Sequence, residues 1–159
     1  MSFALAPADE TFLRDAPQRY EFRMQLPVPA DTVWAEGLAG DRPLSWVRGL
    51  TVRWTSPAPR GVGTTRVAHA AFGAVRLQER YFVWDEGRRT AFTGTAVNVP
   101  LFRRFAEDYV IEPTTNGCTF TWTFAAEARG PRALAAGNDL VQRRMFAAMA
   151  HDTRRHFGL

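Results

Sequence analysis

The chain has 159 residues, which is the size of a single domain and is long enough to bury about two-thirds of the surface that the unfolded chain exposes. All 20 positively charged side chains are arginines, and with 16 acidic residues they leave a formal net charge of +4. The lack of lysine excludes a lysine Schiff base and a Walker-type phosphate lysine, because arginine keeps its proton in proteins.

The arginines are distributed along the chain singly and in four separated pairs. Nucleic-acid binding usually needs basic residues gathered on one face or helix, so we expect surface charge and no nucleic-acid partner. The N-terminal segment contains Asp9 and Glu10 and has no positively charged start, and no run of about 18 apolar residues occurs anywhere. We therefore expect no export signal and no membrane span.

Cys118 is the only cysteine, so the chain cannot form an internal disulfide or a zinc site with several cysteines. This usage is typical of a cytoplasmic protein that depends on its core for stability, with Cys118 as a structural residue. The three histidines, His69, His151 and His156, do not have the spacing of a metal site. We expect no metal and no cofactor.

The first 18 residues contain Pro7 and Pro17 and show no sustained periodicity, which predicts an N-terminal arm (1–18) ahead of the first regular element. Residues 19–159 are predicted to form a single domain. Apolar and polar side chains alternate over residues 20–26, as in a strand with one buried face. The next residues, 27–47, predict two short helices separated at the Gly40-Asp41-Arg42-Pro43 segment.

Six further strands are predicted, separated by turn signals that contain glycine or proline. They are LTVRWTS (50–56), TTRVAHAA (64–71), AVRLQERYFVWD (74–85), RTAFTGTAVN (89–98), FRRFAEDYVIEP (102–113) and CTFTWTFAAEA (118–128). The last segment, residues 131–159, predicts a helix of roughly 24 residues. One stripe of this helix carries Leu134, Val141, Met145, Ala148, Met149 and Asp152.

This order of elements predicts an α+β protein in which a curved antiparallel sheet of six to seven strands wraps on a long C-terminal helix. The apolar face of the sheet needs a cover, and only the final helix is long enough to lie across it. Because one helix does not fill a strongly curved sheet, we expect a cavity between them. A ligand of ordinary size needs a cavity of roughly 300 Å³ or more.

Several short motifs occur in the order that this fold requires. They are VPADTVWAEGLAG (28–40), Trp46, GVGTTR (61–66), LQERYFVWD (77–85) and IEPTTNGCTFTWTF (111–124). With these motifs the chain resembles the START-like (SRPBCC) superfamily, the helix-grip proteins that include polyketide cyclases and dehydratases, lipid-transfer domains and plant pathogenesis-related allergens. The resemblance implies a helix-grip fold and an apolar pocket for a lipid, a polyketide or a similar ligand. It implies no particular reaction, because members range from enzymes to transporters and sensors.

Two carboxylates are predicted to point into the cavity. Alternation places Glu107 on the apolar face of residues 105–111, beside Tyr109, and Glu79 on the apolar face of residues 75–83. Since a buried acid is costly unless it is paired or protonated, each of them needs a partner.

The partners available to these acids are Tyr81, Tyr109 and Arg66. The alternation pattern leaves open whether Arg66 faces the cavity or whether the opposite face, with Val67 and His69, does so.

Two interpretations of the acids stay open. In the first, Glu79 and Glu107 lie near strand ends or bulges in contact with water, or one of them neutralises Arg66. In the second, burial raises the pKa of one carboxyl, which then binds a ligand hydroxyl or acts as a general acid or base. The catalytic candidates are accordingly Glu79, Glu107 and Tyr109.

The predicted ligand-binding residues share inward faces of the predicted elements. They are Trp46, Trp54, Arg66, Glu79, Tyr81, Phe92, Glu107, Tyr109, Trp122, Met145 and Met149. Aromatic residues and methionines in such positions are also typical of an ordinary packed core.

Three functions fit these patterns. The first is the binding of a small hydrophobic or aromatic ligand between sheet and C-terminal helix, by a monomer or a homodimer. The second is an enzyme of the polyketide cyclase or dehydratase type that positions and protonates its substrate with cavity Glu and Tyr residues. The third is a protein-interaction module that uses its outer surface.

Overall fold

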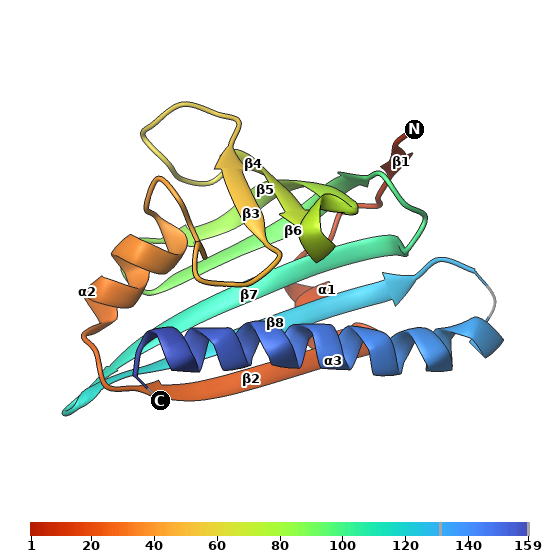
Figure 1. Ribbon diagram of the computed structural model, residues 1–159. Coiled ribbons are helices and arrows are strands. Elements are labelled where there is room, and N and C mark those ends of the chain that lie inside the picture. Colours follow the sequence, from red (N-terminus) through yellow and green to blue (C-terminus); the bar gives the residue numbers. More distant parts are fainter. Residues whose placement is uncertain (131, 159) are drawn as a thin grey trace.

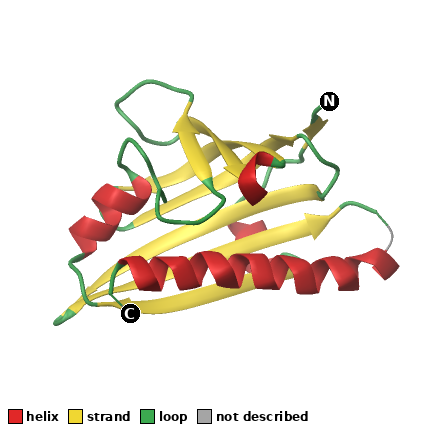
Figure 2. Ribbon diagram, viewed as in Figure 1, coloured by secondary structure: helices red, strands yellow, loops and turns green. Residues whose placement is uncertain are grey.

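A curved antiparallel sheet holds the C-terminal helix against its concave face (Figure 1). The computed structural model describes the backbone of residues 1–130 and 132–158 and the side chains of residues 1–130 and 139–158. The long helix α3 (Arg132–His156) runs along the sheet. The shorter helical segments lie at the ends of the sheet and on its outer side (Figure 2). This arrangement is the predicted helix-grip fold.

Seven strands follow the predicted alternation and form the main path of the sheet, in the order β2-β8-β7-β6-β5-β4-β3. They are β2 (Gln18–Leu26), β3 (Thr51–Trp54), β4 (Thr65–Ala70), β5 (Val75–Asp85), β6 (Arg89–Val97), β7 (Phe102–Thr114) and β8 (Gly117–Ala128). All neighbouring pairs are antiparallel. A short 3-10 turn, η2 (Ala71–Gly73), connects β4 to β5.

The first 18 residues contain regular structure, which corrects the predicted arm. Strand β1 (Phe3–Ala4) pairs with β6, and helix α1 (Glu10–Asp15) begins where the Asp9 side chain accepts a hydrogen bond from the backbone N–H of Phe12. Phe12 and Leu13 are buried against three alanines of β6, β7 and β8, which are Ala91, Ala106 and Ala125. The segment escaped prediction because both elements are too short to show a period.

One irregular helix follows β2 in place of two separate ones. Helix α2 (Ala30–Val33) continues without a break into the π-helical turn η1 (Trp34–Leu38), and residues 41–49 form turns. Position 40, just after the end of this helix, requires glycine, because a Cβ at Gly40 would lie 2.3 Å from the carbonyl oxygen of Ala35.

Helix α3 presents a somewhat different face to the sheet from the predicted stripe. Its buried side chains recur every three or four residues, at Gln142, Phe146, Ala150 and Thr153. Val141, which is 65% exposed, and Ala148 lie on the outer side, contrary to the prediction. Leu134 of the predicted stripe lies outside the described side chains.

Aromatic rings fill the core between sheet and helix. Phe120, Trp122 and Phe124 of β8 all point inward as predicted. The ring of Phe146 on α3 stacks on Phe124 with 3.9 Å between ring centroids. This stack fixes the distance between the helix and strand β8.

Candidate functional site

Arg66 faces the interior of the sheet, which settles the alternative that alternation left open. It is buried together with Ala68 on one face of β4, whereas Val67 and His69 on the other face are partly exposed. Glu79 of β5 lies directly opposite Arg66 in the sheet register. The guanidinium Nε donates a hydrogen bond to Oε2 of Glu79, and the two residues are only 2% and 3% exposed.

Aromatic rings surround the guanidinium of Arg66. Its Cζ lies 4.6 Å from the ring centroid of Phe92 and 5.2 Å from that of Tyr81. Cation–π attraction of this kind compensates in part for the hydration that the buried charge has lost. Arg66 and Glu79 thus form a buried ion pair within the interior, and the interpretation that one acid neutralises Arg66 holds for Glu79.

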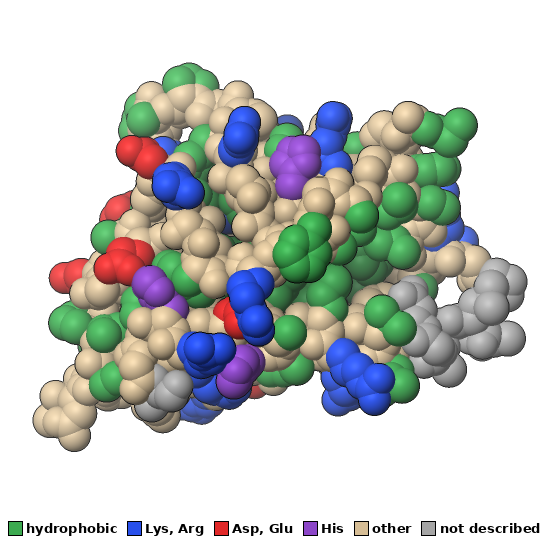
Figure 3. Space-filling view, in the orientation of Figure 1, with side chains coloured by type: hydrophobic (Ala, Val, Ile, Leu, Met, Phe, Trp, Pro, Cys, Tyr) green, Lys and Arg blue, Asp and Glu red, His purple; other side chains and the backbone are tan. Residues whose placement is uncertain are grey.

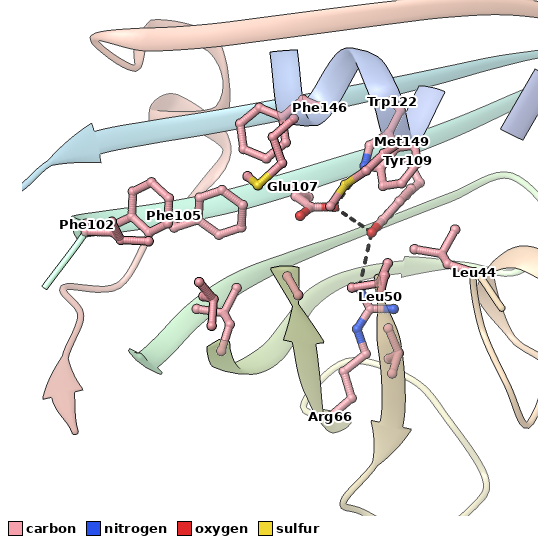
Figure 4. A pocket seen from close by; sticks show the side chains of 16 residues that line it. Leu44, Leu50, Arg66, Phe102, Phe105, Glu107, Tyr109, Trp122, Phe146 and Met149 are labelled. Carbon is pink, nitrogen blue, oxygen red and sulfur yellow. Dashed lines mark hydrogen bonds between the residues drawn. The ribbon is translucent and has the colours of Figure 1, made fainter. Parts of the chain in front are cut away.

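Glu107 of β7 accepts two hydrogen bonds on one oxygen. The Tyr109 hydroxyl donates to Oε2 of Glu107 over 2.6 Å, and the indole Nε1 of Trp122 donates to the same oxygen over 2.8 Å. Arg66 Nη2 donates to the Tyr109 oxygen over 3.2 Å. Figure 4 shows this chain of contacts, in which Tyr109 lies between the guanidinium and the carboxyl group.

Burial sets the protonation of these groups. Loss of hydration and the nearby negative charge of Glu79 raise the pKa of Glu107 to about 7, against the opposing effects of Tyr109, Arg66 and Trp122. Burial and the Glu107 charge also raise the pKa of the Tyr109 phenol. At neutral pH, Tyr109 therefore keeps its proton, while Glu107 exists in both protonated and ionised forms.

A cavity lies between these groups and helix α3. Its volume is about 70 Å³. Its lining is mostly apolar and consists of Leu44, Leu50, Val52, Arg66, Ala70, Val75, Leu77, Leu101, Phe102, Phe105, Glu107, Tyr109, Trp122, Met145, Phe146 and Met149. The volume is below the roughly 300 Å³ expected for a ligand pocket and below the about 150 Å³ that holds a benzene ring, so even a ligand with one aromatic ring requires movement of lining side chains.

Six of the predicted ligand-binding residues line this cavity: Arg66, Glu107, Tyr109, Trp122, Met145 and Met149. Three others, Glu79, Tyr81 and Phe92, lie behind the cavity wall and contact Arg66. The structure thus places six of the predicted residues in the cavity lining and three more in contact with the guanidinium of Arg66.

The two remaining predicted residues are not part of the cavity lining, although the ring centroid of Trp54 lies 5.9 Å from Cζ of Arg66. Trp46 donates from its indole to the Thr153 hydroxyl over 3.1 Å and stacks on His156. Trp54 donates to the carbonyl oxygen of Gly40 over 2.8 Å. The Trp46 indole connects the turns after η1 to α3, and the Trp54 indole connects them to β3.

Phe146 is the most important lining residue that sequence reasoning missed. Its spacing of three residues from Met149 placed it within reach of the same face, but the predicted stripe included Val141, Met145 and Ala148 and left Phe146 out. Leu44 in the turn region carried no periodic signal, whereas Leu50 belongs to the predicted strand 50–56 and alternates there with Val52 and Trp54.

Comparison with known proteins identifies the family. Residues 17–156 match the family model described as polyketide cyclase / dehydrase and lipid transport. The chain belongs to this family. An uncharacterised protein of Mycobacterium tuberculosis is 34% identical over 125 residues, which are 76% of this chain and 72% of the relative.

Solved structures of the same shape support the helix-grip fold of this family member. Ginseng major latex-like protein 151 from Panax ginseng superposes with a TM-score of 0.65 at 10% identity, covering 90% of this chain and 99% of the other. Protein Ms6760 from Mycobacterium smegmatis superposes with a TM-score of 0.60 at 14% identity, covering 84% and 86%. At these identities the likeness concerns the fold alone.

Within residues 1–130 and 139–158, no three or more His, Cys, Asp or Glu side chains are placed to hold a metal ion. Among the helices that the structure describes, none combines the length and the apolar character needed to cross a membrane.

Proposed function

We propose that the protein binds a small hydrophobic or aromatic ligand in the cavity between the sheet and α3, with a ligand hydroxyl or carbonyl group hydrogen-bonded to Glu107. The geometry of Glu107 carries this proposal. Both hydrogen bonds that the structure describes for this carboxyl end on Oε2, and Glu107 belongs to the cavity lining. Oε1 is left for a ligand, and Figure 4 draws it on the side away from Tyr109.

The partial protonation of Glu107 suits either type of ligand oxygen. A protonated carboxyl group donates to a carbonyl oxygen, and an ionised one accepts from a hydroxyl. Apolar side chains make up most of the remaining wall, so the rest of the ligand has to be apolar. Met145 and Met149 on α3 are the unbranched lining residues whose rotation enlarges the space at least cost.

Thermal unfolding in the presence of 1-naphthol, with naphthalene as the analogue that lacks the hydroxyl, tests the proposal. A cavity ligand stabilises the folded state by mass action, so 1-naphthol should raise the unfolding midpoint more than naphthalene does. Met149→Trp fills the cavity and should abolish the shift, whereas Ala148→Trp adds the same ring to the outer side of α3 and should not. An equal shift in both variants contradicts binding in the cavity.

A second function, catalysis of the cyclase or dehydratase type, is favoured by one observation. The pKa of Glu107, at about 7, matches the value at which a carboxyl group is most effective as a general acid or base near neutral pH. In that function Glu107 exchanges the proton with the substrate, and Tyr109 orients the carboxyl group through its hydrogen bond.

Glu107→Gln separates the two functions. The amide preserves size and hydrogen bonding but does not transfer a proton at neutral pH. A ligand-binding protein keeps its affinity for 1-naphthol within a few-fold after this change. An enzyme loses turnover of an enolisable aromatic polyketide by about 10²-fold or more while still binding it.

A further inference from the structure

A long acid-free segment of the chain carries several arginines. Between Asp41 and Glu79 there are six arginines and no Asp or Glu. This segment builds β3, β4, η2 and the turns before them. Positive charge is therefore concentrated in one part of the fold, although the arginines of the whole chain look evenly scattered.

Part of this charge is neutralised by contacts to other elements. Arg48 pairs with Asp152, Arg60 with Asp41, and the buried Arg66 with Glu79. Arg53 and Arg76 are exposed, and in the part of the chain that the structure describes they have no ion-pair partner.

These two arginines lie on the outer side of the sheet. The register pairs His69 of β4 with Thr51 of β3 on one side and with Arg76 of β5 on the other. Arg53 lies two residues from Thr51 and therefore on the same face of β3. The outer corner of the sheet thus combines Arg53 on β3 and Arg76 on β5, neither of which has an ion-pair partner among the residues that the structure describes, with His69 on the intervening strand β4.

Phe72 projects from the same corner. It is 91% exposed, and it has a φ of +55°, a conformation that residues other than glycine rarely adopt. Its backbone N–H donates to the carbonyl oxygen of Gly49 over 3.0 Å, and its ring lies above this glycine. Phe72 thus destabilises the isolated chain in two ways, because its apolar ring is exposed to water and its backbone conformation is strained.

This corner lies next to the cavity. A surface hollow lined by Gly49, Leu50, Thr51, Arg53, His69, Phe72 and Gly73 shares Leu50 with the cavity lining. Ala70 and Val75, on either side of η2, also line the cavity. In Figure 3 the acidic side chains gather toward α2, and the region above α3 shows arginine, histidine and hydrophobic side chains.

We propose that Arg53, His69, Phe72 and Arg76, the η2 surface, dock on an anionic lipid bilayer. Arginines near such a bilayer are attracted by its negative surface potential, and an exposed aromatic ring at a turn inserts among the lipid headgroups. The charge complementarity and the single protruding ring favour a bilayer over other partners. Docking itself does not depend on the proposed function. The two proposals are connected only through Leu50, which lines the cavity and lies next to the lipid when the η2 surface docks.

Vesicle flotation measures this docking directly. The wild-type chain should bind vesicles of equal parts phosphatidylcholine and phosphatidylglycerol, and should bind vesicles of phosphatidylcholine alone much less. Arg53→Gln and Arg76→Gln should each weaken binding about fivefold, and Phe72→Ser should weaken it about tenfold or more. Because exposed charges are screened by salt, binding should also fall as ionic strength rises.

Two matched variants control for overall charge and hydrophobicity. Arg88→Gln removes an exposed arginine at the opposite end of β5, and Val62→Ser removes an exposed apolar side chain at the opposite end of β4. Both should bind within about twofold of the wild type. If Arg88→Gln weakens binding as much as Arg53→Gln, only net charge matters and the η2 surface has no special role.

Two further outcomes overturn the proposal. One is absence of binding to the anionic vesicles at low salt. The other is binding of a single-stranded oligonucleotide with the same dependence on Arg53 and Phe72, which assigns the surface to nucleic acid. The cavity-filled Met149→Trp should still float with the vesicles, so failure of docking and failure of ligand binding are distinguished by separate measurements.

Discussion

The hydroxyl of Tyr109 donates a hydrogen bond to Oε2 of Glu107 over 2.6 Å and accepts one from Nη2 of Arg66 over 3.2 Å. One phenol thus connects the buried ion pair on β4 and β5 with the carboxyl group that lines the cavity. Its removal affects both partners at once.

Tyr109→Phe should lower the free energy of unfolding by about 1–3 kcal/mol, because buried groups on both sides lose a partner. It should also raise the pKa of Glu107 further, since the hydrogen bond from Tyr109 favours the ionised carboxylate. Urea unfolding and a carbon-13 NMR titration of the carboxyl groups measure the two effects. Tyr81→Phe is the control, because the Tyr81 hydroxyl has no hydrogen-bond partner among the described residues. Equal effects of the two changes would contradict the role assigned to Tyr109.

Glu79→Gln should lower the free energy of unfolding by about 3–5 kcal/mol, because it leaves the buried charge of Arg66 without its counter-ion. The double variant Arg66→Met with Glu79→Gln should recover part of this loss, since no uncompensated charge then remains. A double-mutant cycle in urea measures the coupling between the two positions. A coupling near zero would show that the pair does not act as a unit.

The pH dependence of stability should report on Glu107. Its pKa is about 7 in the folded protein against an ordinary value of 4.5, so the folded state holds the proton more tightly than the unfolded state. The resulting stabilisation is complete below the unfolded pKa and is lost as the pH rises through 7. Between about pH 5 and about pH 8 the loss is about 2–3 kcal/mol.

Comparison with Glu107→Gln isolates this contribution. The charged and titratable groups around Glu107 are Arg66, Glu79, Tyr81 and Tyr109, and all remain in the variant. The free energy of unfolding of the wild type should therefore fall relative to that of the variant as the pH rises. A difference that stays constant over this range would mean that Glu107 titrates near its ordinary pKa.

Phe146→Ala should lower the free energy of unfolding by about 3–5 kcal/mol, because it removes the ring that stacks on Phe124 and leaves a larger cavity. An apolar ligand that fills the new space should restore part of the loss, which thermal unfolding with naphthalene measures. Val141→Ala on the exposed side of the same helix should change stability by no more than about 0.5 kcal/mol. A comparable loss in both variants would place the helix differently on the sheet.

The sequence predicted the strands and the inward acids because period-two alternation is carried by each strand alone. Glu107 and Glu79 follow from their apolar neighbours without any knowledge of the sheet. The orientation of Arg66 did not follow, because both faces of β4 carry apolar and polar residues. It depends on the register that pairs Arg66 with Glu79, which is a property of two strands.

Other features could not be predicted because they depend on distant parts of the chain. Trp46 and Trp54 are aromatic residues beside the predicted cavity, but hydrogen bonds to Thr153 and Gly40 direct their indoles elsewhere. The N-terminal segment has no period of its own and is ordered by the alanine surface of β6, β7 and β8. The cavity volume depends on Phe146 and its contact with Phe124, which no local pattern contains.

The buried hydrogen-bonded groups from Glu79 through Arg66 and Tyr109 to Glu107 also determine which electric charge a ligand in the cavity can carry. With Glu107 protonated, the guanidinium of Arg66 and the carboxylate of Glu79 balance each other. With Glu107 ionised, the interior has one negative charge in excess, and a guest carboxylate would bring a second one into surroundings that solvate it poorly. Neutral guests therefore have the advantage over fatty-acid-like anions, and this discrimination becomes sharper as the pH rises above 7.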